Sequence, residues 1–328
     1  MYILLLCCVL LVNMLFMFRL KYTKRFKAKY ITISLVAICS LAIIAYTVYD
    51  IIGSNEKVEQ LNSYEKEWQS EMMAYKELHS FSKGNSQKIA LIDSGISSFQ
   101  SNQVEKMEVL IQEDNNYDTN GHGTIMCSLI KGIDSKVLGI APDAKIYSYK
   151  VVNEAGKVDK SMVIQGIQQA IADDVDIISI SLGSFKEDSN LRECINNAIK
   201  QNITVVASSG DYEATDMLFP ASMDGVISVG ALQEDGKVWN DTNAYESCDI
   251  IAPGVDVLSY NCNAECEFTT GTSQATALIA GYIALIKDFA KQKNIDLTNS
   301  QIQTFLQEIN KNEISYSEVF LEIERLIN

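Results

Sequence analysis

The feature that most constrains the fold of this chain is an alternation of two sequence patterns that begins at residue 88. Short apolar runs such as KIALI, DIISISL and ITVVAS alternate with segments whose apolar residues recur at helical spacing, at residues 161–174, 190–201 and 273–289. This alternation is typical of βαβ units and predicts an α/β fold with a mainly parallel central sheet. Because the apolar runs are nearly continuous, we expect helices on both faces of the sheet.

Two apolar segments near the start of the chain predict a membrane anchor. Residues 2–18 contain a single strongly polar residue, residues 31–49 contain no charged residue, and the loop between them, RLKYTKRFKAKY, holds six basic residues. Both segments approach the length of a transmembrane helix, and a short basic loop stays in the cytoplasm. We therefore expect residues 1–53 to form two transmembrane helices in the cell membrane, which leaves the rest of the chain on the extracytoplasmic side. If translation starts instead at Met14 or Met17, the basic run and residues 31–49 form an export signal, and the following residues are still exported.

The segment between the predicted anchor and the alternating region is predicted to be helical. Within residues 54–80, apolar side chains recur at three- and four-residue steps among Glu, Lys and Gln: Val58, Leu61, Trp68, Met72, Tyr75 and Leu78. This spacing predicts an amphipathic helix followed by the linker KGNSQ, so we assign residues 54–87 to a helical stalk and linker. The apolar stripe suits a stalk, a self-association seam or a strap packed on the following domain.

The charge of the chain argues against a nucleic acid as a partner. Asp and Glu number 42 and Lys and Arg number 27, which gives a net charge of −15, and basic residues concentrate in the loop before residue 30. The remainder is therefore more acidic than the whole. Such a surface repels a phosphate backbone and attracts cationic peptides.

Three reactive side chains stand at the ends of predicted elements. Asp93 follows the apolar run KIALI, His122 lies between two glycines in NGHGT, and Ser273 opens the helical run in TTGTSQATALIAG. Active sites of parallel α/β folds collect at the carboxyl ends of strands. A serine hydroxyl becomes a nucleophile when an imidazole takes its proton, and a carboxylate holds that imidazole in the required tautomer. These residue types supply the three roles.

At these motifs the chain resembles the subtilisin-like serine peptidases, with Asp, His and Ser in that family's order. The resemblance covers roughly residues 85–290 and includes DSG, HGT and GTSxAT, together with the blocks GIAPDAKIYSYKVV, SISLGS and IAPGVDVLS. It implies a three-layer subtilisin-like peptidase domain over residues 88–328 and a serine endopeptidase activity without an organic cofactor. In that activity Ser273 attacks the scissile carbonyl, His122 acts as general base and then acid, and Asp93 orients the imidazole.

The resemblance also implies a substrate groove between two edge segments, Gly156-Lys157-Val158 and Ser181-Leu182-Gly183. An extended peptide would add to these segments as a further strand. We therefore expect exported peptides or proteins as substrates, and the acidic surface favours the processing of basic secreted precursors.

One departure from the family pattern bears on activity. After Ser-Gly in VVASSGDYEATDM, where the family carries an oxyanion-hole asparagine, this chain has Asp211. An asparagine amide donates a hydrogen bond to the developing oxyanion, whereas an ionised carboxylate only accepts one. We therefore expect catalysis to need a protonated Asp211 and to peak at mildly acidic pH. The alternative is a catalytically impaired pseudopeptidase that acts as a peptide-binding membrane protein. Two further departures, Gln274 and Ala277, concern side chains that perform no chemistry.

The remaining expectations concern selectivity, metals and cysteines. Glu213 and Asp216 follow the oxyanion position, so either they favour Lys or Arg before the scissile bond or both carboxylates point to solvent. The sequence shows no metal-ligand spacing, and the short loop KGIDSKVLG does not indicate calcium, so we assign no metal and no cofactor. Cys262 and Cys266 either form a small disulfide or remain two free thiols.

Overall fold

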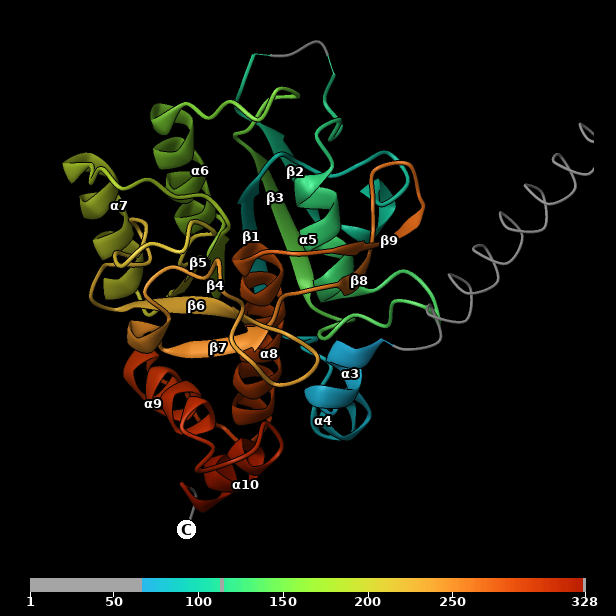
Figure 1. Ribbon diagram of the computed structural model, residues 1–328, viewed down its shortest axis with the longest axis vertical. Coiled ribbons are helices and arrows are strands. Elements are labelled where there is room, and N and C mark those ends of the chain that lie inside the picture. Colours follow the sequence, from blue (N-terminus) through green and yellow to red (C-terminus); the bar gives the residue numbers. More distant parts are fainter. Residues whose placement is uncertain (1–66, 113–114, 327–328) are drawn as a thin grey trace, which may run out of the picture. The chain divides into compact units, whose positions relative to one another are not determined.

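The computed structural model describes residues 67–112 and 115–326, and its centre is a seven-stranded sheet (Figure 1). The strands lie in the order β2-β3-β1-β4-β5-β6-β7, and every neighbouring pair is parallel. Their bounds are β1 Lys88–Asp93, β2 Lys106–Val109, β3 Lys145–Lys150, β4 Ile177–Ile180, β5 Thr204–Ser208, β6 Val226–Leu232 and β7 Ile250–Pro253. The predicted α/β fold with a mainly parallel sheet is confirmed.

The order of the strands reverses beside β1. Strands β2 and β3 lie on one side of β1, and β4 to β7 follow on the other side. At such a switch point the connections leave the carboxyl ends of neighbouring strands in opposite directions, which opens a crevice between them. Asp93 is the last residue of β1 and lies in register with Lys150 at the end of β3. The first of the predicted site residues therefore stands at the edge of the sheet where this crevice opens.

Helices cover both faces of the sheet, as the continuous apolar strands predicted (Figure 1). On one face lie α5 (His122–Lys131) and α8 (Thr272–Gln292), and on the other lie α6 (Lys160–Ala172) and α7 (Ser189–Lys200). Each face has its own apolar core. In α8 every residue from 274 to 290 is buried, which explains why apolar residues occur on all sides of this helix. The predicted helical segments agree with α6, α7 and α8 to within a few residues at each end.

Smaller elements complete the domain. The strands β8 and β9 form an antiparallel hairpin before α8, and two helices, α9 and α10, follow α8. The bounds of these elements and of the two 3-10 helices are β8 Val257–Tyr260, β9 Cys266–Thr269, α9 Asn299–Asn310, α10 Glu318–Arg325, η1 Ser101–Gln103 and η2 Tyr245–Ser247.

The described part of the predicted stalk forms two short helices instead of one. The helices α3 (Trp68–Met72) and α4 (Tyr75–Phe81) are separated at Ala74, whose φ of 55° lies in the left-handed region. The prediction of one continuous helix is therefore wrong here. The break changes which side chain is buried, because Met73 is fully buried whereas Met72 is 37% exposed.

These two helices pack on the globular part as a strap. The Trp68 indole donates a hydrogen bond to the carbonyl oxygen of Asp256 at 3.0 Å, and the Gln69 amide donates to that of Leu258 at 3.1 Å. Helix α4 packs against α8. Of the three arrangements that the apolar stripe left open, this part of the chain adopts the strap, because its apolar side chains complete the core around α8.

The predicted membrane anchor at residues 1–53 and the first part of the stalk lie outside the described residues. Within residues 67–112 and 115–326, no helix has both the length and the apolar composition that crossing a bilayer requires.

Candidate active site

Asp93 and His122 form a hydrogen-bonded pair at the carboxyl edge of the sheet. Asp93 ends β1, His122 is the first residue of α5, and His122 Nδ1 lies 2.8 Å from Asp93 Oδ1. The Ser94 N–H donates to the same carboxylate oxygen at 2.7 Å. The Asp93 side chain is 4% exposed and the His122 side chain 32% exposed. The carboxylate is thus fixed and shielded, while part of the imidazole surface remains open to a substrate.

The glycines around His122 allow α5 to begin against the turn that follows β1. Gly121 has a φ of 97°, in the left-handed region that favours glycine. A Cβ on Gly123 would lie 2.3 Å from the carbonyl oxygen of Gly95, so a larger residue would push the helix away. The Gly123 N–H donates to Ser94 Oγ at 2.8 Å. The NGHGT motif is therefore the local reason why the imidazole reaches the carboxylate.

Asp118 holds the start of α5, a role that the sequence analysis missed. Its Oδ1 accepts a hydrogen bond from the Gly121 N–H at 2.8 Å, and its Oδ2 accepts from the N–H and the hydroxyl of Thr124 at 3.0 and 2.6 Å. The side chain is buried. The signal that could have revealed it is an acidic residue just before a predicted helix start, where free N–H groups need acceptors.

The surroundings of His122 favour its protonated form. Burial of the ring lowers the pKa of His122, but the charge and hydrogen bond of Asp93 and the charges of Asp118 and Asp211 together raise it above its ordinary value of 6.5. The imidazole becomes a free base only as the pH rises through this raised pKa.

Ser273 lies at the start of α8, just after the turn at Gly271. It is the second residue of the helix and is half-buried. A Cβ on Gly271, two residues before Ser273, would lie 2.8 Å from Gln274 Oε1 and 2.9 Å from Asp211 Oδ2, so a larger residue here would displace the ends of both side chains. The N–H groups at a helix start carry partial positive charge and stabilise a nearby anion. Helix α5 also packs against α8.

Asp211 lies beside the serine motif, where it binds the residue before the serine. The N–H and the hydroxyl of Thr272 both donate to Asp211 Oδ1, at 2.9 and 2.6 Å. The Gly210 N–H donates in turn to Thr272 Oγ1 at 3.3 Å. Asp211 is exposed. Since Oδ1 is engaged by Thr272, Oδ2 is the oxygen left for a reacting group.

The two predicted groove segments both lie at accessible edges. Residues 156–158 are exposed in a turn that Val152 and Val158 close as an antiparallel bridge, and Asn120 of NGHGT donates to the carbonyl oxygen of Glu154 at 3.4 Å. Residues 181–183 follow β4 directly, and Ser181 Oγ donates to the Ser273 carbonyl oxygen at 3.4 Å. One segment is thus tied to the histidine motif and the other to the serine motif.

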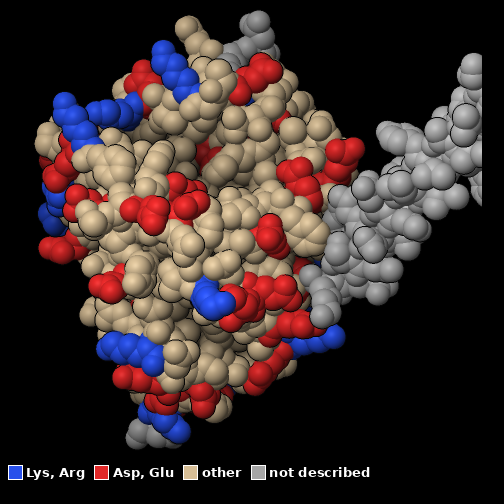
Figure 2. Space-filling model, viewed as in Figure 1, with Lys and Arg blue, Asp and Glu red and all other residues tan. Residues whose placement is uncertain are grey.

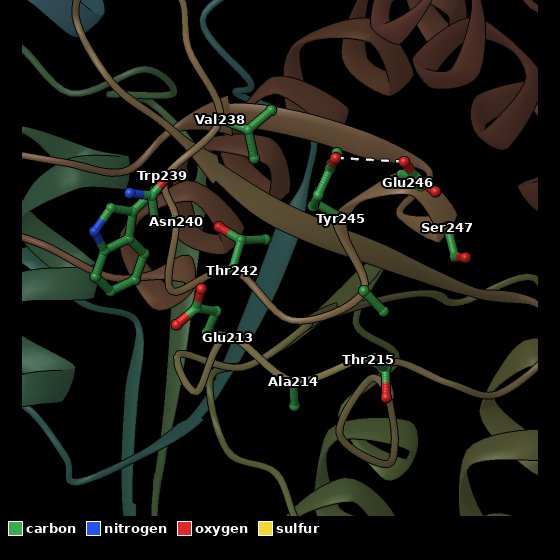
Figure 3. A pocket seen from close by; sticks show the side chains of 11 residues that line it. Glu213, Ala214, Thr215, Val238, Trp239, Asn240, Thr242, Tyr245, Glu246 and Ser247 are labelled. Atoms are coloured by element: carbon green, nitrogen blue, oxygen red, sulfur yellow. Dashed lines mark hydrogen bonds between the residues drawn. The ribbon is translucent and has the colours of Figure 1, made fainter.

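Glu213 lines a surface cavity of about 670 Å³ that Asp216 does not line (Figure 3). In Figure 3 the Glu213 carboxylate lies near the side chains of Trp239 and Thr242. The whole lining consists of Glu213, Ala214, Thr215, Val238, Trp239, Asn240, Thr242, Ala244, Tyr245, Glu246 and Ser247. None of the predicted catalytic or groove residues belongs to it, so the two acidic residues of this loop do not share a pocket beside Ser273.

The cysteines of the described region form no disulfide. Cys262 and Cys266 flank the tip of the β8–β9 hairpin and are half-buried, so of the two alternatives the structure adopts two thiols over a disulfide. Cys127, Cys194 and Cys248 are buried. Burial raises the pKa of the Cys127 thiol to about 12, which keeps it unreactive.

Comparison with known proteins agrees with this geometry. The sequence matches the subtilase family over residues 84–316. It is 32% identical to Subtilisin Savinase of Lederbergia lenta over 227 residues, which cover 68% of this chain and 83% of that protein. It is 32% identical to an alkaline protease of Alkalihalobacillus alcalophilus over 227 residues, which cover 68% of this chain and 59% of that protein. It is 33% identical to the minor extracellular protease Epr of Bacillus subtilis over 237 residues, which cover 70% of this chain and 35% of that protein.

Proposed function

Because the chain belongs to the subtilase family and is a subtilisin-type serine endopeptidase, we propose that Asp93, His122 and Ser273 are its catalytic residues. The observation that carries this assignment is the 2.8 Å hydrogen bond between His122 and a buried Asp93 at the switch point of the sheet. The start of α8, which holds Ser273, supplies the third group in a setting that favours negative charge.

The order of the steps follows from the hydrogen bonds of the imidazole. Nδ1 of His122 keeps its proton toward Asp93, so Nε2 is the nitrogen that takes the proton of Ser273 as its Oγ attacks the peptide carbonyl carbon. The buried carboxylate stabilises the imidazolium that forms. His122 then gives the proton to the leaving amine, and water hydrolyses the acyl-enzyme by the same route.

The oxyanion formed in the first step lies, in this proposal, between the Ser273 N–H and Asp211. Asp211 Oδ1 already accepts two hydrogen bonds from Thr272, so a proton on this carboxyl group resides on Oδ2. A protonated Oδ2 donates to the oxyanion, whereas an ionised one repels it.

The proposed setting is an anchored, outward-facing enzyme that processes exported peptides. The apolar segments and basic loop before residue 50 support the membrane anchor. The net charge of −15 supports cationic substrates, and Figure 2 shows acidic side chains spread over the whole visible face, with most basic side chains toward its edge. A long-range field of this sign attracts basic precursors to the surface.

Labelling with a fluorophosphonate tests the catalytic assignment. The purified full chain is expected to react covalently and to lose the label when Ser273 is replaced by alanine, because the reagent requires an activated serine. Failure of the wild type to react at pH 5–8 would contradict the assignment. That outcome would favour the alternative that the acidic oxyanion position suggests, a pseudopeptidase that binds peptides without cleaving them.

Protease treatment of intact cells tests the membrane setting. We expect added protease to degrade residues 54–328, while a reporter inserted between Arg19 and Lys29 stays protected until the cells are lysed. Protection of the region after residue 54 in intact cells would overturn both the orientation and the exported substrate.

A further inference from the structure

Two glycine-containing segments run side by side next to the proposed nucleophile. The first carries Gly183 and is tied to the nucleophile through the bond from Ser181 Oγ to the Ser273 carbonyl oxygen. The second carries Gly210, whose N–H donates to Thr272 Oγ1. In the proposed function the scissile carbonyl lies between Ser273 and Asp211, the residue after Gly210, and the substrate lies along residues 181–183. The side chain before the scissile bond is attached next to that carbonyl, so it lies beside these two backbones.

The side chain of Leu218 fills that space. A Cβ on Gly183 would lie 2.7 Å from Leu218 Cβ and 2.8 Å from its Cδ1, and a Cβ on Gly210 would lie 2.7 Å from Leu218 Cγ. Real Cβ atoms do not approach other atoms so closely, so Leu218 is in contact with both backbones. It is 7% exposed. The side chain of Leu218 therefore closes the gap between the two glycines.

Hydrogen bonds on both sides fix the backbone of this leucine. The Leu218 N–H donates to the Ser209 carbonyl oxygen at 2.9 Å, on the side of Gly210. The next residue, Phe219, exchanges two hydrogen bonds with Ser184, at 2.9 and 3.0 Å, on the side of Gly183. The segment thus bridges both walls, and these bonds hold the backbone of Leu218 in place between them.

An aromatic pair joins the two walls a second time. Phe185 and Tyr212 follow Gly183 and Gly210 by two residues each, and their ring centroids lie 5.7 Å apart. Both rings are largely exposed, at 60% and 67%. The two walls are therefore connected at Leu218 and again at this ring pair, which limits how far they can separate around a bulky side chain.

We infer that Leu218 sets the selectivity of the enzyme, by restricting the residue before the scissile bond to a small one, Gly, Ala or Ser. A longer side chain in this place meets the leucine, and overpacking a closed site is costly. The inference rests on the proposed function, since it needs a substrate along residues 181–183. It replaces the expectation of Lys or Arg, because the residue between the walls is an apolar leucine and Glu213 lines a different cavity.

Peptide-library cleavage by the full chain tests this inference. The wild type is expected to cleave after Ala, Gly or Ser with kcat/KM at least about tenfold above that for Phe, Leu or Lys. In Leu218→Gly, and to a smaller extent in Leu218→Ala, this ratio should reverse in favour of Phe and Leu, because the space is vacated. The matched control is Leu191→Ala on α7, a leucine with the same 7% exposure that lies away from the groove, and it should leave the ratio unchanged.

The same preparations are labelled with the fluorophosphonate, so that two failures can be told apart. A wild type that reacts with the reagent but cleaves after Phe or Lys as well as after Ala overturns the role of Leu218 and leaves the catalytic assignment intact. If both Leu218 variants keep the wild-type ratio of kcat/KM between small and large residues, the role of Leu218 is likewise overturned and the catalytic assignment stands. A wild type that neither reacts nor cleaves overturns the proposed function, and the inference with it.

Discussion

Asp118 and Asp211 stand at the starts of the two helices of the active site, and they differ in how completely their oxygens are used. Both oxygens of the buried Asp118 accept hydrogen bonds, from the Gly121 N–H and from the N–H and hydroxyl of Thr124. Asp211 is exposed and accepts both bonds from Thr272 on Oδ1. A carboxylate with both oxygens bound serves as a cap. One with an open oxygen beside a reactive serine can take part in the chemistry.

The comparison extends to the two halves of the site. The half with Asp93 and His122 is fixed by buried hydrogen bonds and by close glycine packing, so its geometry exists before substrate binds. In the proposed mechanism the half with Ser273 depends on Asp211, an exposed carboxyl group. A carboxyl group donates a hydrogen bond only in its protonated form, whereas an amide donates in every state. The proposed mechanism therefore combines a fixed proton-transfer pair with an oxyanion site whose side-chain donor is a carboxyl group.

The largest expected effect comes from the fixed half. Replacing Asp93 with asparagine should lower kcat by about 10⁴-fold, because the amide no longer holds the imidazole in the tautomer that can accept a proton. The folded structure should persist, since the asparagine oxygen can still accept the Ser94 N–H. Turnover of a peptide substrate and urea unfolding measure the two effects. A loss below tenfold would mean that this pair does not drive proton transfer.

The next effect comes from the half with Ser273 and Asp211. Asp211→Asn supplies a donor at every pH, and turnover at neutral to alkaline pH should rise by about 10²–10³-fold, the value known for losing the corresponding donor in a subtilisin. Removing the charge of Asp211 also removes one contribution to the raised pKa of His122, so the acidic limb of kcat/KM should move to lower pH. Full pH profiles of both enzymes measure the rise and the shift.

The control for this variant is Asp216→Asn, an exposed acid in the same loop. It should change neither turnover nor the acidic limb. If Asp211→Asn leaves turnover unchanged or slows it, Asp211 does not face the oxyanion and does not correspond to the family's oxyanion-hole asparagine.

Asp118 should behave in the opposite way, with a loss of stability as its main effect. Asp118→Ala leaves the donors of Gly121 and Thr124 without their acceptor, and we expect the free energy of unfolding to fall by about 3 kcal/mol. Urea unfolding in the Ser273→Ala background measures this loss without self-digestion. The exposed Asp224→Ala serves as a control, and an equal loss in both variants would refute the capping role.

The sequence predicted those parts of the molecule whose cause is local. The strand that ends at Asp93 is buried on both faces and is therefore continuously apolar, and NGHGT carries glycines because α5 touches the turn after β1. The break at Ala74 could not be predicted, because the helix before it is held by hydrogen bonds to residues distant in the sequence. Trp68 donates to the Asp256 carbonyl oxygen and Gln69 donates to that of Leu258. The same holds for Leu218, whose importance arises only where two glycines meet it in space.

The smallest effect concerns a third carboxylate at a helix start, Glu67 before α3. Glu67 is 9% exposed, and this burial raises its pKa from 4.5 to about 7. The charge of Asp134 also raises the pKa, whereas hydrogen bonds from the Leu138 N–H and from Ser70 lower it. Glu67 ionises at lower pH in the unfolded chain than in the folded one, so the free energy of unfolding should fall as the pH rises from about 4.5 through about 7.

Glu67→Gln removes this dependence and should stabilise the protein by roughly 2–3 kcal/mol at pH 8 and hardly at pH 4. Urea unfolding at both pH values measures the difference, with the exposed Glu71→Gln of the same helix as control. Equal pH dependence of the free energy of unfolding in wild type and Glu67→Gln would show that the hydrogen bonds of Glu67 compensate for its burial, as those of Asp118 do. The comparison between a fully bonded carboxylate and an incompletely bonded one would then fail.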